Sequence, residues 1–307
     1  MANKIYGGTY PNGKLYQWND VDAWIEKAPK LNSTRIYDLV TLNNKVYGGT
    51  YWYGQLVEWN GVDAWVEVAP KLGIENRIRS LAVFNGKIYG GTYPSGKLYE
   101  WNGSNAWIEV APKLGGVTEI DALVVFNNKL YGAGEEGRLY QWNGTNAWIE
   151  VAPQPEDELF VLSLAVFNGK IYGGGYWYGK LYEWNGTNAW IEVASLSEDV
   201  AEINALAVYN NKLYGASYPS GKLYEWNGSN AWIEVAPQLG GITTIYDLAV
   251  YNNKLYGGCS GGKLYKWNDI DAWIEVAPQL EAETQIWSLV VADIVVSVED
   301  EDFAFVT

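Results

Sequence analysis

The sequence predicts an all-β fold in which seven four-stranded blades close into a ring, a seven-bladed β-propeller. A Tyr-Gly step recurs every 41 or 42 residues, at Tyr6, Tyr47, Tyr89, Tyr131, Tyr172, Tyr214 and Tyr256. A pair of tryptophans accompanies each step, from Trp18 and Trp24 to Trp267 and Trp273. Repeats of about 40 to 45 residues built from short strands are typical of propeller blades. The 307 residues therefore predict one repeat domain rather than two globular domains.

Each copy of the repeat predicts four antiparallel strands, named a to d from the centre of the ring to its rim. In the third copy these strands are residues 80–84, 87–93, 97–101 and 106–111. Turn-forming residues separate them, namely Asn85-Gly86, Pro94-Ser95-Gly96 and Asn102-Gly-Ser-Asn105. Asn-Gly between two β-prone runs is a strong signal for a hairpin. Pro112 ends strand d, because proline cannot donate to a strand ladder.

The two ends of the chain predict how the ring closes. The chain begins inside a blade, at residues 3–5, and supplies only strands b, c and d of that blade. The missing strand a returns near the far end as residues 286–291. We therefore expect the last strand to complete the first blade, in a 3+1 closure that leaves no open sheet edge.

The residues after Val291 do not fit the repeat. Residues 292–307 contain two β-prone stretches around the acidic run Glu299-Asp-Glu-Asp302. The sequence thus predicts a propeller over residues 1–291 and an acidic C-terminal tail or linker over residues 292–307. An added strand or an oligomer contact is the alternative for this segment.

The composition excludes several classes of partner. The net charge is −15, and no basic stripe could displace counterions from phosphates, so nucleic acid is not an expected partner. The same charge argues against an anionic membrane surface, and no apolar run is long enough to predict membrane insertion. The start of the chain shows no signal peptide. Localisation stays open, with an extracellular or cell-surface setting favoured, and Cys259 leaves the redox compartment undecided.

The residue types present also argue against an enzyme. The chain has no histidine and one cysteine, which removes the usual triads, thiol catalysis and most zinc sites, so no cofactor or metal is expected. Carboxylates could serve a glycosidase, but the strand-d glutamates recur in every blade and cannot mark one active site. Asp121 with Glu135 or Glu136 is the best asymmetric pair.

The two faces of the predicted ring differ in their sequences. The a–b and c–d turns repeat nearly unchanged, whereas the b–c turns and d–a connections vary from blade to blade; we call the face that these variable segments form the variable face. Three tryptophans outside the repeat fall on it, Trp52, Trp177 and Trp287, and Tyr53 and Tyr178 flank the first two. Exposed aromatic clusters commonly mark binding surfaces. The alternative is that these rings fold over their own hairpins.

One further position varies in every blade, just before strand a and beside the central channel. It is occupied in turn by Tyr37, Arg79, Asp121, Leu162, Asn204, Tyr246 and Trp287. Polar and aromatic groups that converge on a channel mouth predict a site for a single ligand. Drift at positions without a shared packing role is the alternative.

The repeated segments K-x-Y-G-G, G-x-L-Y-x-W-N-G and A-W-I-E-V resemble the repeats of bacterial kelch-like propellers. They are also similar, more loosely, to the repeats of tachylectin-type lectins. The resemblance covers residues 3–291 and implies a propeller. Lectins of this shape generally bind one sugar per blade or blade junction, but the aromatic turns of this chain occur in two blades only, which favours a site of lower symmetry.

These observations predict a non-enzymatic recognition propeller that binds a glycan or a cell surface through the variable face. The aromatic rings would stack on sugars, and Asp121, Asn204 and Arg79 would supply hydrogen bonds. The alternative is a protein-interaction scaffold, or a structural subunit of a larger extracellular assembly, that uses the same face or the tail.

Overall fold

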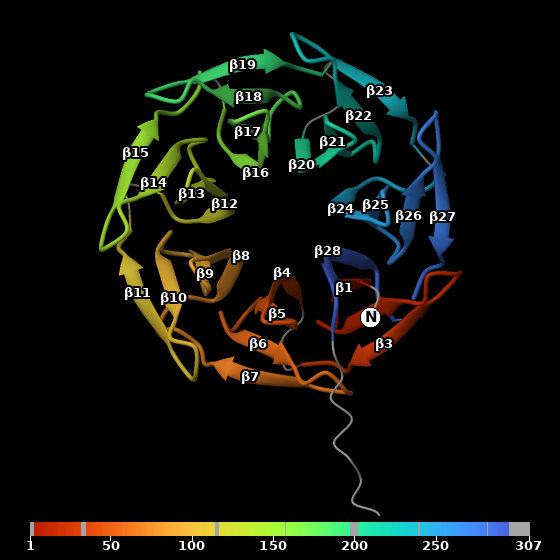
Figure 1. Ribbon diagram of the computed structural model, residues 1–307, viewed down its shortest axis with the longest axis horizontal. Coiled ribbons are helices and arrows are strands. Elements are labelled where there is room, and N and C mark those ends of the chain that lie inside the picture. Colours follow the sequence, from red (N-terminus) through yellow and green to blue (C-terminus); the bar gives the residue numbers. More distant parts are fainter. Residues whose placement is uncertain are drawn as a thin grey trace, which may run out of the picture.

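The protein is a seven-bladed β-propeller in the computed structural model, which confirms the predicted fold class (Figure 1). Each blade is a sheet of four antiparallel strands. The structure describes residues 3–31, 35–113, 117–156, 158–196, 202–238, 240–280 and 282–294. Most of the predicted tail, residues 295–307, lies outside these described residues. Within the described ranges, no helix is long and apolar enough to cross a bilayer.

Four sets of strands run from the channel to the rim (Figure 1). The inner strands a, with the blade 1 strand first, are β28 (Gln285–Ala292), β4 (Ile36–Leu42), β8 (Arg77–Phe84), β12 (Ile120–Phe126), β16 (Val161–Phe167), β20 (Glu202–Tyr209) and β24 (Ile245–Tyr251). Strands b are β1 (Lys4–Tyr10), β5 (Lys45–Thr50), β9 (Lys87–Tyr93), β13 (Lys129–Gly134), β17 (Lys170–Gly175), β21 (Lys212–Tyr218) and β25 (Lys254–Cys259).

Strands c are β2 (Leu15–Trp18), β6 (Leu56–Trp59), β10 (Leu98–Trp101), β14 (Leu139–Trp142), β18 (Leu181–Trp184), β22 (Leu223–Trp226) and β26 (Leu264–Trp267). The outer strands d are β3 (Trp24–Ala28), β7 (Trp65–Ala69), β11 (Trp107–Ala111), β15 (Trp148–Ala152), β19 (Trp190–Ala194), β23 (Trp232–Ala236) and β27 (Trp273–Ala277).

The ring closes as the sequence predicted. Strand β28 from the C-terminal end pairs antiparallel with β1, and the sheet order is β28-β1-β2-β3. The pairing runs from Lys4 opposite Ala292 to Tyr10 opposite Gln285. The closing strand is thus slightly longer than the predicted residues 286–291, and it gives the first blade its innermost strand.

Asparagine shapes the a–b and c–d turns, which lie on the face opposite the variable face. In the a–b turns, asparagines such as Asn85, with φ of 49°, adopt the left-handed conformation that tight hairpins require. In the c–d turns the asparagine side chain replaces backbone partners: Asn102 Oδ1 accepts hydrogen bonds from the amides of Ser104, Asn105 and Ala106. Hydrogen bonds within each turn therefore hold its shape, which accounts for the near-identical sequence of these turns in every blade.

Aromatic residues fill the space between neighbouring blades. The strand-b tyrosine of one blade packs against the strand-c tryptophan of the next, with ring centroids 5.3 Å apart for Tyr47 and Trp101. Trp18 and Tyr256 make the same contact at 5.2 Å across the closure between blades 7 and 1. These rings are buried. Their burial explains why tyrosine and tryptophan recur in every copy of the repeat.

Candidate functional site

The seven variable channel positions lie inside the inner strands and not just before them, which corrects the predicted strand starts. Each one falls at a break in register between strand a and strand b, where the bulged residue has no partner on strand b; the positions are Tyr37, Arg79, Asp121, Leu162, Asn204, Tyr246 and Trp287. Bulges redirect side chains and are frequent beside binding sites. Here a bulge in each blade frees one position from the strand ladder.

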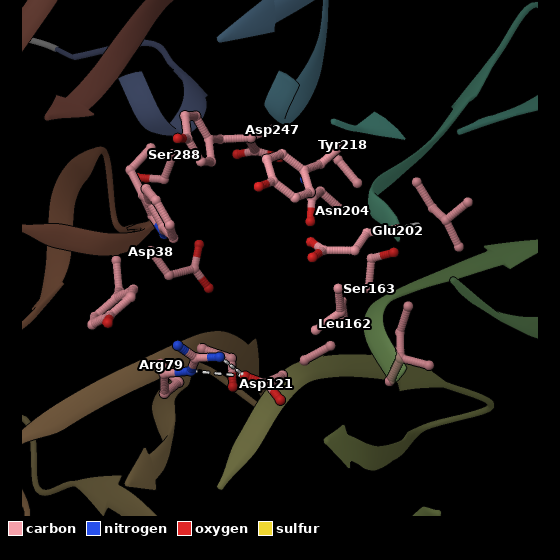
Figure 2. A pocket seen from close by; sticks show the side chains of 18 of the residues that line it. Asp38, Arg79, Asp121, Leu162, Ser163, Glu202, Asn204, Tyr218, Asp247 and Ser288 are labelled. Carbon is pink, nitrogen blue, oxygen red and sulfur yellow. Dashed lines mark hydrogen bonds and ion pairs between the residues drawn. The ribbon is translucent and has the colours of Figure 1, made fainter. Parts of the chain in front are cut away.

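All seven bulged residues line one cavity of about 590 Å³ at the mouth of the central channel. Tyr176, Glu202 and Tyr218 line it as well. Figure 2 shows the carboxylates of Asp38 and Glu202 projecting into this cavity from opposite sides, with Arg79 and Asp121 together on a third side. The inner strands of the whole ring therefore build a single site with no repeat symmetry.

Two aspartates beside the bulges connect adjacent blades. Asp38 accepts hydrogen bonds from the amide of Leu39 at 2.8 Å and from the amide of Leu81 in the next blade at 2.7 Å. Asp247 does the same with Leu248 and Leu289. Burial raises the pKa of both aspartates to about 7, even though the backbone donors lower it. Both carboxyl groups still line the cavity.

Arg79 is bound by acidic neighbours. Its Nε donates to Asp121 Oδ1 at 2.7 Å and lies 3.3 Å from Glu119 Oε2. Burial alone would lower the pKa of Arg79, but the charges of Asp121 and Glu119 outweigh it and raise the pKa. Burial raises the pKa of Glu119 to about 7, assisted by the charge of Asp121, and burial raises that of Glu202 to about 7 as well. Asp121 and Glu119 therefore already compensate the positive charge of Arg79.

A cluster of arginines and aromatic rings lies beside the cavity on blades 1 to 3. The Arg35 guanidinium lies 3.9 Å from the ring centre of Trp287 and 4.5 Å from that of Tyr10. Arg77 lies 4.2 Å from the ring centre of Tyr93. Three of the four arginines of the chain, Arg35, Arg77 and Arg79, gather here. We call Tyr10, Arg35, Tyr37, Tyr51, Arg77, Tyr93 and Trp287 the arginine–aromatic cluster.

The rings of Trp287 and Tyr37 are covered by this cluster. Tyr246 stacks on Trp287 with ring centroids 4.3 Å apart, and Arg35 lies over the same indole. Tyr37 is buried and meets Trp287 edge-on at 5.8 Å. Trp287, predicted from the sequence to stack on a sugar, therefore has no open ring face, and the ring of Tyr37 is buried as well.

The two Tyr-Trp-Tyr-Gly turns are exposed and lie on different blades. Trp52 is 53% exposed and Trp177 is 39% exposed, and each packs against the tyrosine before it in its own turn. Trp52 has a φ of 73°, an unusual value for a bulky residue, whereas in the second turn it is Tyr178 that has a positive φ, of 58°. Tyr53 and Tyr178 are exposed as well. The structure does not join the two tryptophans in one patch.

Glu158 explains the shape of the second turn. It is fully buried in the connection before β16, and its Oε1 accepts the amides of Tyr176 and Trp177 at 3.1 and 3.2 Å and those of Leu159 and Phe160. A Cβ atom on Gly175 would lie 2.2 Å from Glu158 Oε2, so glycine leaves room for this carboxylate. Burial raises the pKa of Glu158, although the hydrogen bonds from these amides lower it.

The structure thus brings six of the ten predicted binding positions into the lining of one cavity, namely Tyr37, Arg79, Asp121, Asn204, Tyr246 and Trp287. Two more lie beside it through the tyrosine that precedes them: Trp177 packs against Tyr176 of the lining, and Trp52 packs against Tyr51 of the cluster. Tyr53 and Tyr178 are not in the lining. Sequence reasoning missed Asp38, Glu202, Asp247, Arg35 and Arg77. Their departure from the repeat was the available signal, and it does not show which of them point into the channel.

Among the described residues, no three histidine, cysteine, aspartate or glutamate side chains are grouped as metal ligands. Cys259 is buried, and burial raises its pKa. The chemistry that the described cavity offers is therefore hydrogen bonding, charge and contact with aromatic rings.

Comparisons with known proteins support the fold. No protein-family model matches the chain, and no curated protein matches it. Similar solved structures include the WD40 β-propeller domain of Doa1, with 13% identity, a TM-score of 0.66, and 86% of this chain and 88% of that chain covered. YCF48 bound to D1 peptide is similar at 14% identity and a TM-score of 0.62, over 96% and 98% of the two chains.

A catalytically inactive variant of virginiamycin B lyase from Staphylococcus aureus with quinupristin is also similar, with 11% identity, a TM-score of 0.70, and 92% and 91% of the two chains covered. At such identities these likenesses show a β-propeller and nothing finer. The neighbours include a propeller bound to a peptide and an inactive variant of an enzyme. The resemblance to kelch-like or tachylectin-type repeats stays a prediction.

Proposed function

We propose that this propeller is a non-enzymatic recognition module that binds a polypeptide segment of a partner protein at the mouth of its central channel. The observation that carries the proposal is the convergence of the seven bulged residues on one cavity. Nearly identical blades would make seven equal sites if the repeat itself bound the ligand. A single cavity with a different wall from each blade supports one ligand per ring.

The arginine–aromatic cluster favours a protein over a sugar. Tryptophan, tyrosine and arginine are the residues most enriched where protein interfaces gain their binding energy. Trp287 and Tyr37 are covered by neighbouring side chains and have no open face for a pyranose ring. Trp52 continues the cluster outward through Tyr51, at a ring distance of 4.7 Å, and is the most exposed aromatic residue among those described.

The structural neighbours are compatible with this proposal. YCF48 bound to D1 peptide is a propeller that holds a peptide, and the likeness extends over 96% of this chain. This likeness adds only that a propeller of this kind accommodates a peptide. The identity is too low to transfer a partner to this chain. An extracellular setting and membership in a larger assembly remain predictions from the sequence.

The test is selection of binding peptides from a random displayed library on the intact protein. Trp52→Ala and Arg77→Ala should each weaken the selected peptides at least about tenfold, because both remove interface contacts without opening the core. Val62→Ala is the matched control, since Val62 is 64% exposed on the opposite face of the same blade. Peptides that bind all three variants equally would place the site elsewhere and refute the proposal.

Glycan binding is the second candidate, and the exposed rings of Trp177 and Tyr178 favour it. They lie outside the cluster in a turn that Glu158 holds in shape. A glycan array with the intact protein and the Trp52→Ala/Trp177→Ala double variant distinguishes the candidates. Sugar binding that is lost in the double variant would support a lectin, whereas a blank array would leave the polypeptide ligand as the better account.

A further inference from the structure

The cavity at the channel mouth is acidic. Four carboxyl groups line it, those of Asp38, Asp121, Glu202 and Asp247. Among the described residues that line it, the one cation is Arg79, which is held by Asp121 and Glu119. The pair of Arg79 and Asp121 occupies one side, while Asp38 and Glu202 face the open centre from opposite sides (Figure 2). Above about pH 7, where Asp38, Glu202 and Asp247 are ionised, an uncompensated negative charge therefore faces whatever enters the cavity.

One buried oxygen in the wall has no hydrogen-bond donor. Asp121 has a side chain that is 3% exposed, and its Oδ1 accepts both hydrogen bonds from Arg79. Its Oδ2 is buried without a partner among the described residues. Buried carboxylate oxygens are almost always satisfied, and each unsatisfied one requires an explanation. A donor that arrives with a ligand would satisfy it, and this observation is independent of the overall charge.

Aromatic rings complete the lining. Tyr37, Tyr246 and Trp287 come from three inner strands, and Tyr176 and Tyr218 line the cavity as well. The ring faces of Trp287 and Tyr37 are covered, but the hydroxyl oxygens of the lining tyrosines can accept hydrogen bonds from a cation. Arg35, which lies over Trp287 at 3.9 Å, is a guanidinium already in contact with this aromatic wall. A guanidinium or an ammonium therefore matches both the charge and the walls of the cavity.

We infer that the cavity receives one basic side chain, arginine or lysine, from the partner segment, and holds it between Asp38 and Glu202 with a donor reaching Asp121. This inference rests on the proposed function, because it names the chemistry of the segment that the mouth recognises. The rest of the segment would lie over the arginine–aromatic cluster, whose Arg35 and Arg77 suit carbonyl or carboxylate groups beside the basic residue.

The test uses short glycine–serine peptides that carry one central arginine, lysine, glutamine or glutamate. Binding is followed by NMR of the tryptophan indole signals, in which Trp287 reports on the cavity. The titration is run at about pH 8, where Asp38 and Glu202 are ionised, and at about 0.15 M salt to screen the general charge of the chain. The arginine and lysine peptides should shift the Trp287 signal with millimolar affinity, and the other two should not. Glu202→Gln and Asp38→Asn should each weaken that binding about tenfold, since each removes a charge-assisted hydrogen bond.

Glu156→Gln is the matched control, because Glu156 is an exposed glutamate in a d–a connection of the same face. It should leave binding of the arginine peptide unchanged. Equal binding of the glutamine peptide, equal loss in Glu156→Gln, or no shift with any peptide up to about 10 mM would overturn the inference. The proposed function would survive this result if library peptides without a basic residue still lost affinity in Trp52→Ala. Folding of each variant is checked by its thermal unfolding.

Discussion

Glu158 illustrates at the residue scale how one buried side chain fixes a loop that a ligand could contact. Its carboxylate accepts four backbone amides from two segments, the connection before β16 and the turn after β17. Glu158→Ala should therefore lower the free energy of unfolding by about 2–4 kcal/mol, because the buried amides would lose a charged acceptor. Urea unfolding measures this change. Glu156→Ala in the same connection should stay within about 0.5 kcal/mol, and an equal loss in both variants would contradict this role.

The aspartates at the channel predict how stability depends on pH. Burial raises the pKa of Asp38 from 3.8 to about 7 in the folded chain. The folded state then keeps a proton that the unfolded state has released, so the free energy of unfolding falls as pH rises from about 4 to about 7. Asp38→Asn removes this titration and should reduce the loss of stability between about pH 5 and about pH 8 by about 1–3 kcal/mol. An unchanged pH dependence in the variant would show that Asp38 does not titrate in this window.

Beside the bulges, the residues that face each other on strands a and b are matched in size. Ser80 on β8 lies opposite Gly91 on β9 and donates to the carbonyl of Ile120 in the next blade, and Ser163 lies opposite Gly174 in the same way. In two other blades both partners are alanine, as in Ala205 opposite Ala216. A Cβ on Gly91 would lie 2.7 Å from Ser80 Oγ, so a hydroxyl on strand a requires glycine on strand b.

This pairing predicts a compensating double substitution. Gly91→Ala alone should destabilise the protein by about 1–3 kcal/mol, since the new methyl meets Ser80 and Ile120. Ser80→Ala in the same chain should recover part of that loss, because it recreates the alanine pair. Thermal or urea unfolding of the two single variants and the double variant gives the coupling energy. Gly240→Ala is the control, since nothing lies within 4 Å of its added methyl. Additive effects would refute the pairing.

The closing strand makes a prediction at the level of elements. Deleting residues 286–307 removes β28 from Ile286 onward and leaves the edge of β1 unpaired, so the truncated chain should aggregate. Deleting only residues 297–307 should cost little, on the prediction that they are a tail or linker. Light scattering of the two purified proteins compares them. A soluble monomeric chain without residues 286–307 would contradict the importance of the closure.

The elements could be predicted from the sequence because the repeat shows each strand seven times and averages out local ambiguity. Strand starts were less accurate: strand a of the third blade begins at Arg77 and not at residue 80, because pairing with β9 extends past the bulge at Arg79. The turns show a limit of local reasoning. Residues 51–54 and 176–179 have the same four-residue sequence and both end in a glycine with a positive φ, yet the other positive φ angle falls on Trp52 in one turn and on Tyr178 in the other. Their neighbours, Arg77 in one case and Glu158 in the other, differ.

At the scale of the whole molecule, the ring combines a repeated frame with a single asymmetric cavity. The variable position of each inner strand was visible in the sequence, because the seven copies of the repeat can be compared with one another and differ at this position. The sequence did not reveal that Asp38, Asp247 and Glu202 share that cavity, or that Arg35 covers Trp287. Those facts depend on bulges and on contacts between blades, which no local pattern encodes.

The central claim is that the asymmetric cavity at the channel mouth binds one partner segment per ring. Calorimetric titration of the intact protein with a library-selected peptide tests it most directly, because it counts sites as well as measuring affinity. We predict one peptide per chain, with affinity lost in Trp52→Ala and retained in Val62→Ala. Several equivalent sites per chain, or full affinity in Trp52→Ala, would assign binding to the repeated blades and contradict the account.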